Sequence, residues 1–234
     1  QGEAIGTLTN GESIIRIMNK TGYEAAIPGN HEFDYGMEQF MKLTEVADFP
    51  YISCNINRDG EMLFDAYRVF EVGQYKIAIV GVTTPWTLSS ESPSIFEDEN
   101  GNRIYDFLQD ATGERLYSAV QAAVDGARED GADYVIVSGH VGLEADAHPW
   151  NYADIISNVS GIDAFIDGHS HDEEQIVMKD KDGKEVQRTA SGTKLESVGY
   201  VRISGETGKI TSGIWSWSND VNVPTLLGIS NAAT

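Results

Sequence analysis

Four of the five histidines in this chain come directly after segments with the residue pattern of a buried strand. These four are His31, His140, His169 and His171. In an open α/β sheet, ligands bind outside the carboxyl ends of the strands. Imidazole nitrogens gathered there are suitable ligands for zinc, manganese, iron and similar divalent ions. The pattern therefore predicts a metal site at one edge of a sheet.

The neighbours of these histidines support the same chemistry. Asn30 precedes His31 and adds a neutral oxygen ligand, and a glycine stands one or two residues before His31, His140 and His169, where the chain must turn sharply. Cys54 is the only cysteine, which excludes an internal disulfide and a cysteine-based zinc site. We expect Cys54 to be a buried strand thiol, and Trp86 to pack in the core or a loop rather than line a cleft.

The elements that position these residues alternate between helix and strand in the first two thirds of the chain. Apolar residues at helical spacing predict helices over 11–20, 36–47, 112–130 and 151–159. Apolar runs predict strands over 23–28, 50–55, 66–72, 75–82, 133–137 and 162–167. Residues 84–111 are predicted to form a long loop. Such alternation indicates a sheet with helices outside it.

The pattern changes from residue 174 onward. Turn signals separate predicted strands over 174–179, 185–190, 197–204 and 208–217, which indicates an antiparallel meander. The fold class expected is therefore α/β shading into α+β, with a mixed sheet. Residues 218–234 are polar and are predicted to be a linker or tail.

Composition excludes several partners. The 234 residues include 16 Lys and Arg against 37 Asp and Glu, giving a net charge of −21. Such a chain is a poor binder of nucleic acid polymers or anionic lipid surfaces, both of which require a basic face. No apolar run approaches the ~20 residues that a membrane-spanning helix needs.

Three motifs, read in order, resemble a known superfamily. Gly29-Asn30-His31-Glu32, Gly139-His140 and Gly168-His169-Ser170-His171 are similar to the motifs of the calcineurin-like metallophosphoesterases. The string that continues to Phe33-Asp34-Tyr35-Gly36 resembles the 5′-nucleotidase branch. The resemblance implies a four-layer αββα sandwich with a dinuclear site of divalent ions such as zinc or manganese.

The resemblance also implies a role for each residue. Asn30, His140 and His169 would bind one ion, and His171 would bind the other. His31 would be the catalytic histidine near the phosphate, oriented by Asp34. Asn30 and His31 would also contact the substrate.

One departure from the family's pattern matters. The family has an earlier Asp-x-His motif and a Gly-Asp motif whose aspartate bridges the two ions, and neither stands ahead of Gly29 in this chain. Gln1-Gly2-Glu3 resembles the residues that come directly after that Gly-Asp in the family. We therefore expect residues 1–217 to be a partial catalytic domain truncated at its N-terminus, with 218–234 leading toward an absent C-terminal domain. Such a piece would hold at most one ion weakly and would be inactive, whereas the intact parent would be an enzyme.

For the intact parent, the expectation is metal-dependent hydrolysis of nucleotide phosphate esters outside the cytoplasm: secreted, cell-surface or periplasmic. A 2′,3′-cyclic-nucleotide phosphodiesterase or a nucleotide-sugar hydrolase would use the same site. A rival of another class is a non-catalytic surface domain that keeps the fold and binds a metal or another ligand. The upstream sequence discriminates between them, since an Asp-x-His and a Gly-Asp there favour the enzyme.

Overall fold

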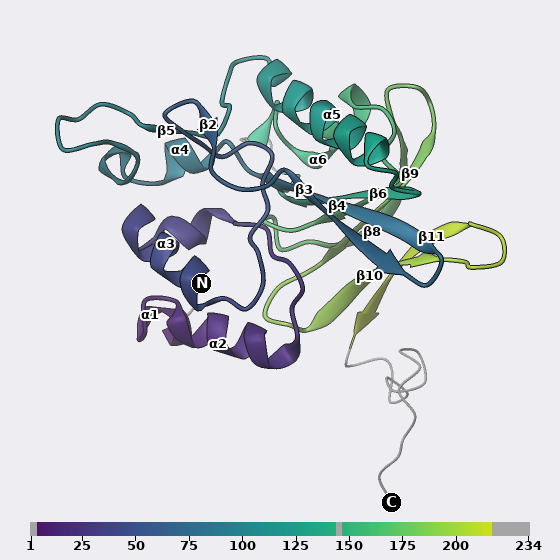
Figure 1. The fold of residues 1–234 in the computed structure, drawn as a ribbon, viewed down its shortest axis with the longest axis horizontal. Helices are drawn as coiled ribbons and strands as arrows, with labels where there is room; N and C mark the ends of the chain where they lie inside the picture. Colours follow the sequence, from purple (N-terminus) through teal and green to yellow (C-terminus); the bar gives the residue numbers. More distant parts are fainter. Residues whose placement is uncertain (1–3, 144–146, 217–234) are drawn as a thin grey trace, which may run out of the picture.

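The computed structural model describes residues 4–143 and 147–216 (Figure 1). Its helices are α1 (Ala4–Thr7), α2 (Glu12–Thr21), α3 (Met37–Val46), α4 (Thr87–Ser90), α5 (Glu114–Glu129) and α6 (Tyr152–Asn158), with 3-10 helices η1 (Asn30–Phe33) and η2 (Pro93–Phe96). Its strands are β1 (Asn57–Arg58), β2 (Glu61–Met62), β3 (Tyr67–Val72), β4 (Tyr75–Thr83), β5 (Tyr105–Asp106), β6 (Tyr134–His140), β7 (Ala164–Asp167), β8 (Glu173–Lys179), β9 (Glu185–Ser191), β10 (Ser197–Ile203) and β11 (Ile210–Ser216). None of the described helices is long and apolar enough to cross a membrane.

A mixed sheet forms the centre of the described chain. Its strand order is β3-β4-β6-β7-β9-β8, and β4, β6, β7 and β9 run parallel while β3 and β8 pair antiparallel at the edges. The hairpin β10-β11 forms a second sheet, and β2-β1-β5 a third. The parallel centre puts the carboxyl ends of β6 and β7 side by side, which is the arrangement expected from the sequence.

Helices lie on both sides of this sheet. The apolar face of α5 packs through Leu116, Val120 and Val124 on Val80 and Val137 of the central strands. Figure 1 shows α6 on the same side, and α1, α2 and α3 on the side away from α5. This mixed α/β architecture confirms the predicted fold class.

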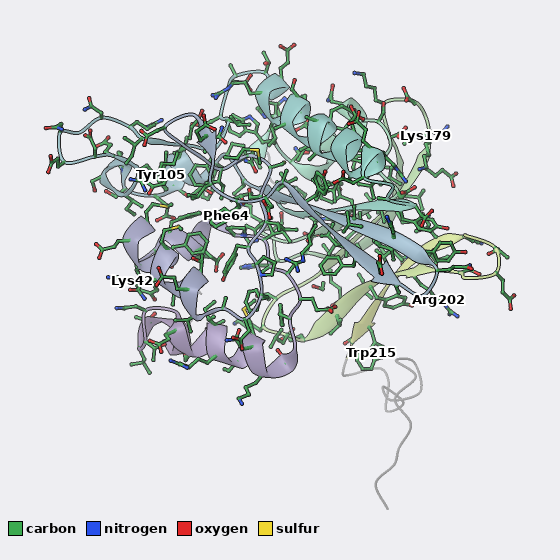
Figure 2. The ribbon with its side chains drawn as sticks, viewed as in Figure 1. Lys42, Phe64, Tyr105, Lys179, Arg202 and Trp215 are labelled. Carbon is green, nitrogen blue, oxygen red and sulfur yellow. The ribbon has the colours of Figure 1, made fainter. Side chains whose placement is uncertain are left out.

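A second cluster of apolar side chains joins α2 and α3 to the segment that follows β4. Phe33 is fully buried there and makes edge-to-face contacts with Phe40, Phe96 and Phe107, with ring centroids 5.2–5.8 Å apart. In Figure 2, Phe64, which packs on this cluster, lies near the middle of the molecule, while Lys42 lies toward the outside. The cluster fixes η1, which carries Asn30 and His31.

Two predicted strands were wrong. Residues 23–28 and 50–55 form isolated bridges only: Ala26 bridges to Tyr51, and Ile52 bridges to Asp65. Pro28 and Pro50 lack the N–H groups that would extend these bridges into a ladder. The predicted loop 84–111 contains α4, η2 and β5, whereas the predicted tail 218–234 lies outside the described residues.

Candidate active site

The carboxyl ends of two neighbouring parallel strands, β6 and β7, position His140 and His169. His140 is the last residue of β6 and pairs in register with Thr83, the last residue of β4. β7 ends at Asp167, and Gly168 follows with its N–H donating to the Gly139 carbonyl at 3.1 Å. The turn after β7 is thereby held against the end of β6, which brings the His169 ring beside that of His140.

A glycine allows the third residue to approach. Gly29 precedes η1, and a Cβ atom at this position would lie 2.8 Å from the Cε1 and Nε2 atoms of His140. The N–H of Gly29 donates to the Glu32 carboxylate at 2.6 Å, which caps η1 and places Asn30 in the interior. Asn30 therefore reaches the histidines from a separate part of the chain.

Asn30, His140 and His169 form a compact triangle of donor atoms. The Oδ1 atom of Asn30 lies 3.1 Å from His140 Nε2 and 3.2 Å from His169 Nδ1, and the two nitrogens are 3.3 Å apart. Metal bonds of about 2.0–2.2 Å to nitrogen or oxygen put neighbouring ligand atoms roughly 3.0–3.5 Å apart. The triangle therefore fits a single divalent ion.

Burial keeps the His140 imidazole neutral, as an ion requires. Burial lowers the pKa of His140 from 6.5 to about 3, and the positive charges of His169, His31 and His171 act in the same direction. A neutral ring presents a lone pair to a cation. Within residues 4–143 and 147–216, no three His, Cys, Asp or Glu side chains gather to hold an ion, so the amide of Asn30 is needed to complete the set.

His31 and Asp34 form a separate pair beside the triangle. His31 Nδ1 lies 3.0 and 3.1 Å from the two carboxylate oxygens of Asp34, and the His31 side chain is 52% exposed. The prediction that a strand delivers His31 was wrong, because η1 carries it. The predicted pairing of His31 with Asp34 is confirmed by these distances, whereas their catalytic roles stay predictions.

His171 is exposed and lies outside the donor triangle. Its φ is 58° and that of His169 is 86°, so both residues occupy the left-handed region that L residues rarely adopt. These angles fold residues 168–171 into a tight turn rather than the extended segment in which side chains two apart diverge. The role of His171 as a ligand of a second ion stays a prediction.

The segment after β4 adds residues beside the site that the histidine motifs do not include. Trp86 contacts the site, with its ring centroid 5.5 Å from that of His169. The N–H of Thr84 donates to the carbonyl of His140 at 3.0 Å, which holds this segment against the end of β6. Glu91 lies near enough that the Asp34 charge adds to the effect of burial in raising the Glu91 pKa. The expectation that Trp86 packs only in the core or a loop therefore missed its contact with His169.

A mixed sheet with helices on both sides, imidazoles after its central strands β6 and β7, and an amide from η1 beside them is the arrangement expected of the calcineurin-like metallophosphoesterases. Comparisons with known proteins agree. Over 181 residues the chain is 33% identical to a 5′-nucleotidase of Vibrio vulnificus and 30% identical to one of Bos taurus. These matches cover 74% and 73% of the chain but 30% and 28% of the relatives. The chain thus spans less than a third of the length of these curated relatives.

A solved structure and a family model extend the comparison. The sulfate thiohydrolase SoxB of Thermus thermophilus superposes with a TM-score of 0.75 at 26% identity, over 92% of this chain and 37% of that one. The model described as Bacterial capsule synthesis protein PGA_cap matches residues 6–184. The chain belongs to the family of that model, has the fold of the calcineurin-like phosphoesterases and is similar in sequence to 5′-nucleotidases.

Proposed function

We propose that this domain belongs to an enzyme that hydrolyses phosphate esters of nucleotides, with a divalent ion held by Asn30, His140 and His169. The observation that carries the proposal is the triangle of donor atoms 3.1–3.3 Å apart. The 5′-nucleotidase relatives support the nucleotide substrate class. A bound ion would act as a Lewis acid that polarises a phosphoryl oxygen and lowers the pKa of a water.

The chain's own residues supply the proton chemistry. Asp34 accepts a hydrogen bond from His31 Nδ1, which fixes the orientation of the ring. The Nε2 atom of His31 faces away from Asp34 and, when it carries a proton, would donate it to negative charge that develops on a phosphoryl or leaving-group oxygen. Half of the His31 side chain is exposed, so a substrate can reach it.

We assign His171 to a second ion in the complete protein. The turn at residues 168–171 presents it near His140, whose pKa responds to the His171 charge. His171 alone cannot hold an ion, so the described residues would hold one ion weakly at the triangle and this chain by itself would be inactive. A location outside the cytoplasm is part of the proposal and rests on the resemblance alone.

The test is a panel of phosphate-release assays on the full-length protein with added Mn²⁺ or Zn²⁺. The panel contains nucleoside monophosphates, 2′,3′-cyclic nucleotides, nucleotide sugars and, because of the SoxB similarity, a sulfate-bearing substrate. Turnover of a nucleotide phosphoester supports the proposal. Tight metal binding without turnover of any member would instead favour a non-catalytic binding domain.

A matched pair of variants tests the role of His31. His148 Nδ1 lies 3.1 and 3.0 Å from the oxygens of Asp154, nearly the same geometry as the pair of His31 and Asp34. His31→Asn should lower kcat about 10²–10⁴-fold with unchanged metal content. His148→Asn should leave both unchanged. Loss of metal with retained turnover in His31→Asn would refute the assignment.

A further inference from the structure

A buried guanidinium lies behind the proposed metal site. Arg188 on β9 is fully buried, and its Nη1 donates to Asp172 at 2.6 Å and to Glu174 at 2.8 Å, while its Nη2 donates to Asp167 at 2.9 Å. The guanidinium also lies 4.0 Å from the centroid of the Tyr152 ring. A charge taken out of water is costly unless it is paired, and Arg suits a buried pairing with several oxygens.

Two of the partners of Arg188, Asp167 and Asp172, lie at the two ends of the turn at residues 168–171, which we call the histidine turn. Asp167 is the last residue of β7, and Asp172 directly follows His171. One side chain therefore joins both ends of the segment that carries His169 and His171. Both histidines have positive φ, a conformation that persists only where the surroundings hold it.

Asp167 links this turn to the other histidine. Its Oδ2 binds Arg188, and its Oδ1 accepts hydrogen bonds from the N–H groups of Val141 at 3.2 Å and Gly142 at 3.3 Å. These two residues directly follow His140. The ion pair thus contacts the backbone beside all three histidines without touching the donor atoms themselves.

We propose that Arg188, acting through Asp167 and Asp172, is a positioning residue. It holds the histidine turn and the backbone after His140 in metal-binding geometry. The proposal rests on the proposed function, because it takes His140 and His169 as ligands of an ion. Arg188 touches neither ion nor substrate. Its effect is to keep the donor atoms at ligand spacing before an ion arrives, so its loss lowers metal affinity.

The chain offers a matched control at the opposite end of the same strand. Asp163 precedes β7, is also buried, pairs with Arg128 and Lys184 at 2.5 Å each, and accepts from the N–H of Val135 at 2.7 Å. Asp163 lies four residues before Asp167, which in extended chain is a distance of roughly 13 Å along the strand. Asp163→Asn therefore disturbs a comparable buried ion pair far from the histidines.

The experiment measures the Kd for Zn²⁺ by calorimetry, and the Tm, for the wild type, Arg188→Met, Arg188→Lys, Asp172→Asn and Asp163→Asn. Loss of a supporting contact typically weakens metal binding 10–100-fold, which is the change expected for Arg188→Met. The Kd of Arg188→Lys should lie between those of the wild type and Arg188→Met, because an ammonium is a point charge without the planar fork that reaches both carboxylates. Asp163→Asn should lower the Tm but change the Kd less than twofold.

Asp172→Asn keeps the test decisive if Arg188→Met does not fold, because Asp172 is partly exposed and its replacement leaves the Arg188–Asp167 pair. It should weaken Zn²⁺ binding at least threefold. The positioning role is overturned if folded Arg188→Met or Asp172→Asn binds Zn²⁺ like the wild type, and the proposed function then stands. If the wild type itself binds no Zn²⁺, the metal site fails and the positioning role with it.

Discussion

The stability of the metal-free protein should fall as the pH drops below 6.5, because of His140. The pKa of this ring is about 3 in the folded chain and 6.5 in an unfolded chain. The unfolded state therefore takes up the proton first, so the contribution of His140 is complete above pH 6.5 and is lost progressively toward pH 3. At about 1.36 kcal/mol per pH unit, lowering the pH from 7 to 5 should remove about 2 kcal/mol. This is an upper value because the ring keeps some contact with solvent.

The assay is urea unfolding in the presence of a chelator at pH 7, 6 and 5, for the wild type and for His140→Asn. Every other titrating group is present in both proteins, so the difference between the two pH profiles isolates His140. The wild type should lose up to about 2 kcal/mol more than the variant between pH 7 and 5. Parallel profiles would refute the reasoning, because they would show that His140 takes up its proton equally easily in both states.

Three substitutions test the packing around the site. Gly29→Ala should lower the free energy of unfolding by about 1–3 kcal/mol and weaken Zn²⁺ binding, because its Cβ would displace the His140 ring; urea unfolding and calorimetry measure the two effects. Asn55→Ala should cost about 3 kcal/mol or more in urea unfolding, because the buried amide bonds both the N–H and the carbonyl of Thr83. Phe33→Ala should cost about 3–5 kcal/mol by the same assay, and a loss below about 1 kcal/mol would contradict the aromatic cluster.

The central strands could be predicted because a strand that is buried on both faces leaves a continuous apolar run in the sequence. Residues 75–82 and 133–137 are continuous apolar runs, and both lie in the parallel centre of the sheet as β4 and β6. The short strands β1 and β5 could not be predicted, because they pair across about fifty residues and carry polar side chains. Their pairing depends on the course of the chain after β4, which no local pattern contains.

The site was predictable to a similar extent. Asn30, His140 and His169 could be found because their residue types and glycine neighbours point to metal chemistry, and the donor triangle brings them together. Arg188 could not be found, since an arginine within a short strand is typical of a solvent-facing position. Trp86 was expected to pack in the core or a loop, and its contact with His169 depends on tertiary structure.

Two carboxylates, one just before β7 and one at its last residue, tie this strand to β6. Asp163 accepts from the N–H of Val135 near the start of β6, and Asp167 accepts from the N–H of Val141 just beyond its end. A slip of one residue between β6 and β7 would break both bonds and reverse which face each side chain occupies. Each carboxylate is itself held by buried or half-buried cations, so the register is fixed at both ends. The pair of Asp167 and Arg188 holds the end of β7 that leads to His169, whereas Asp163 and its cations hold the opposite end, away from the histidines.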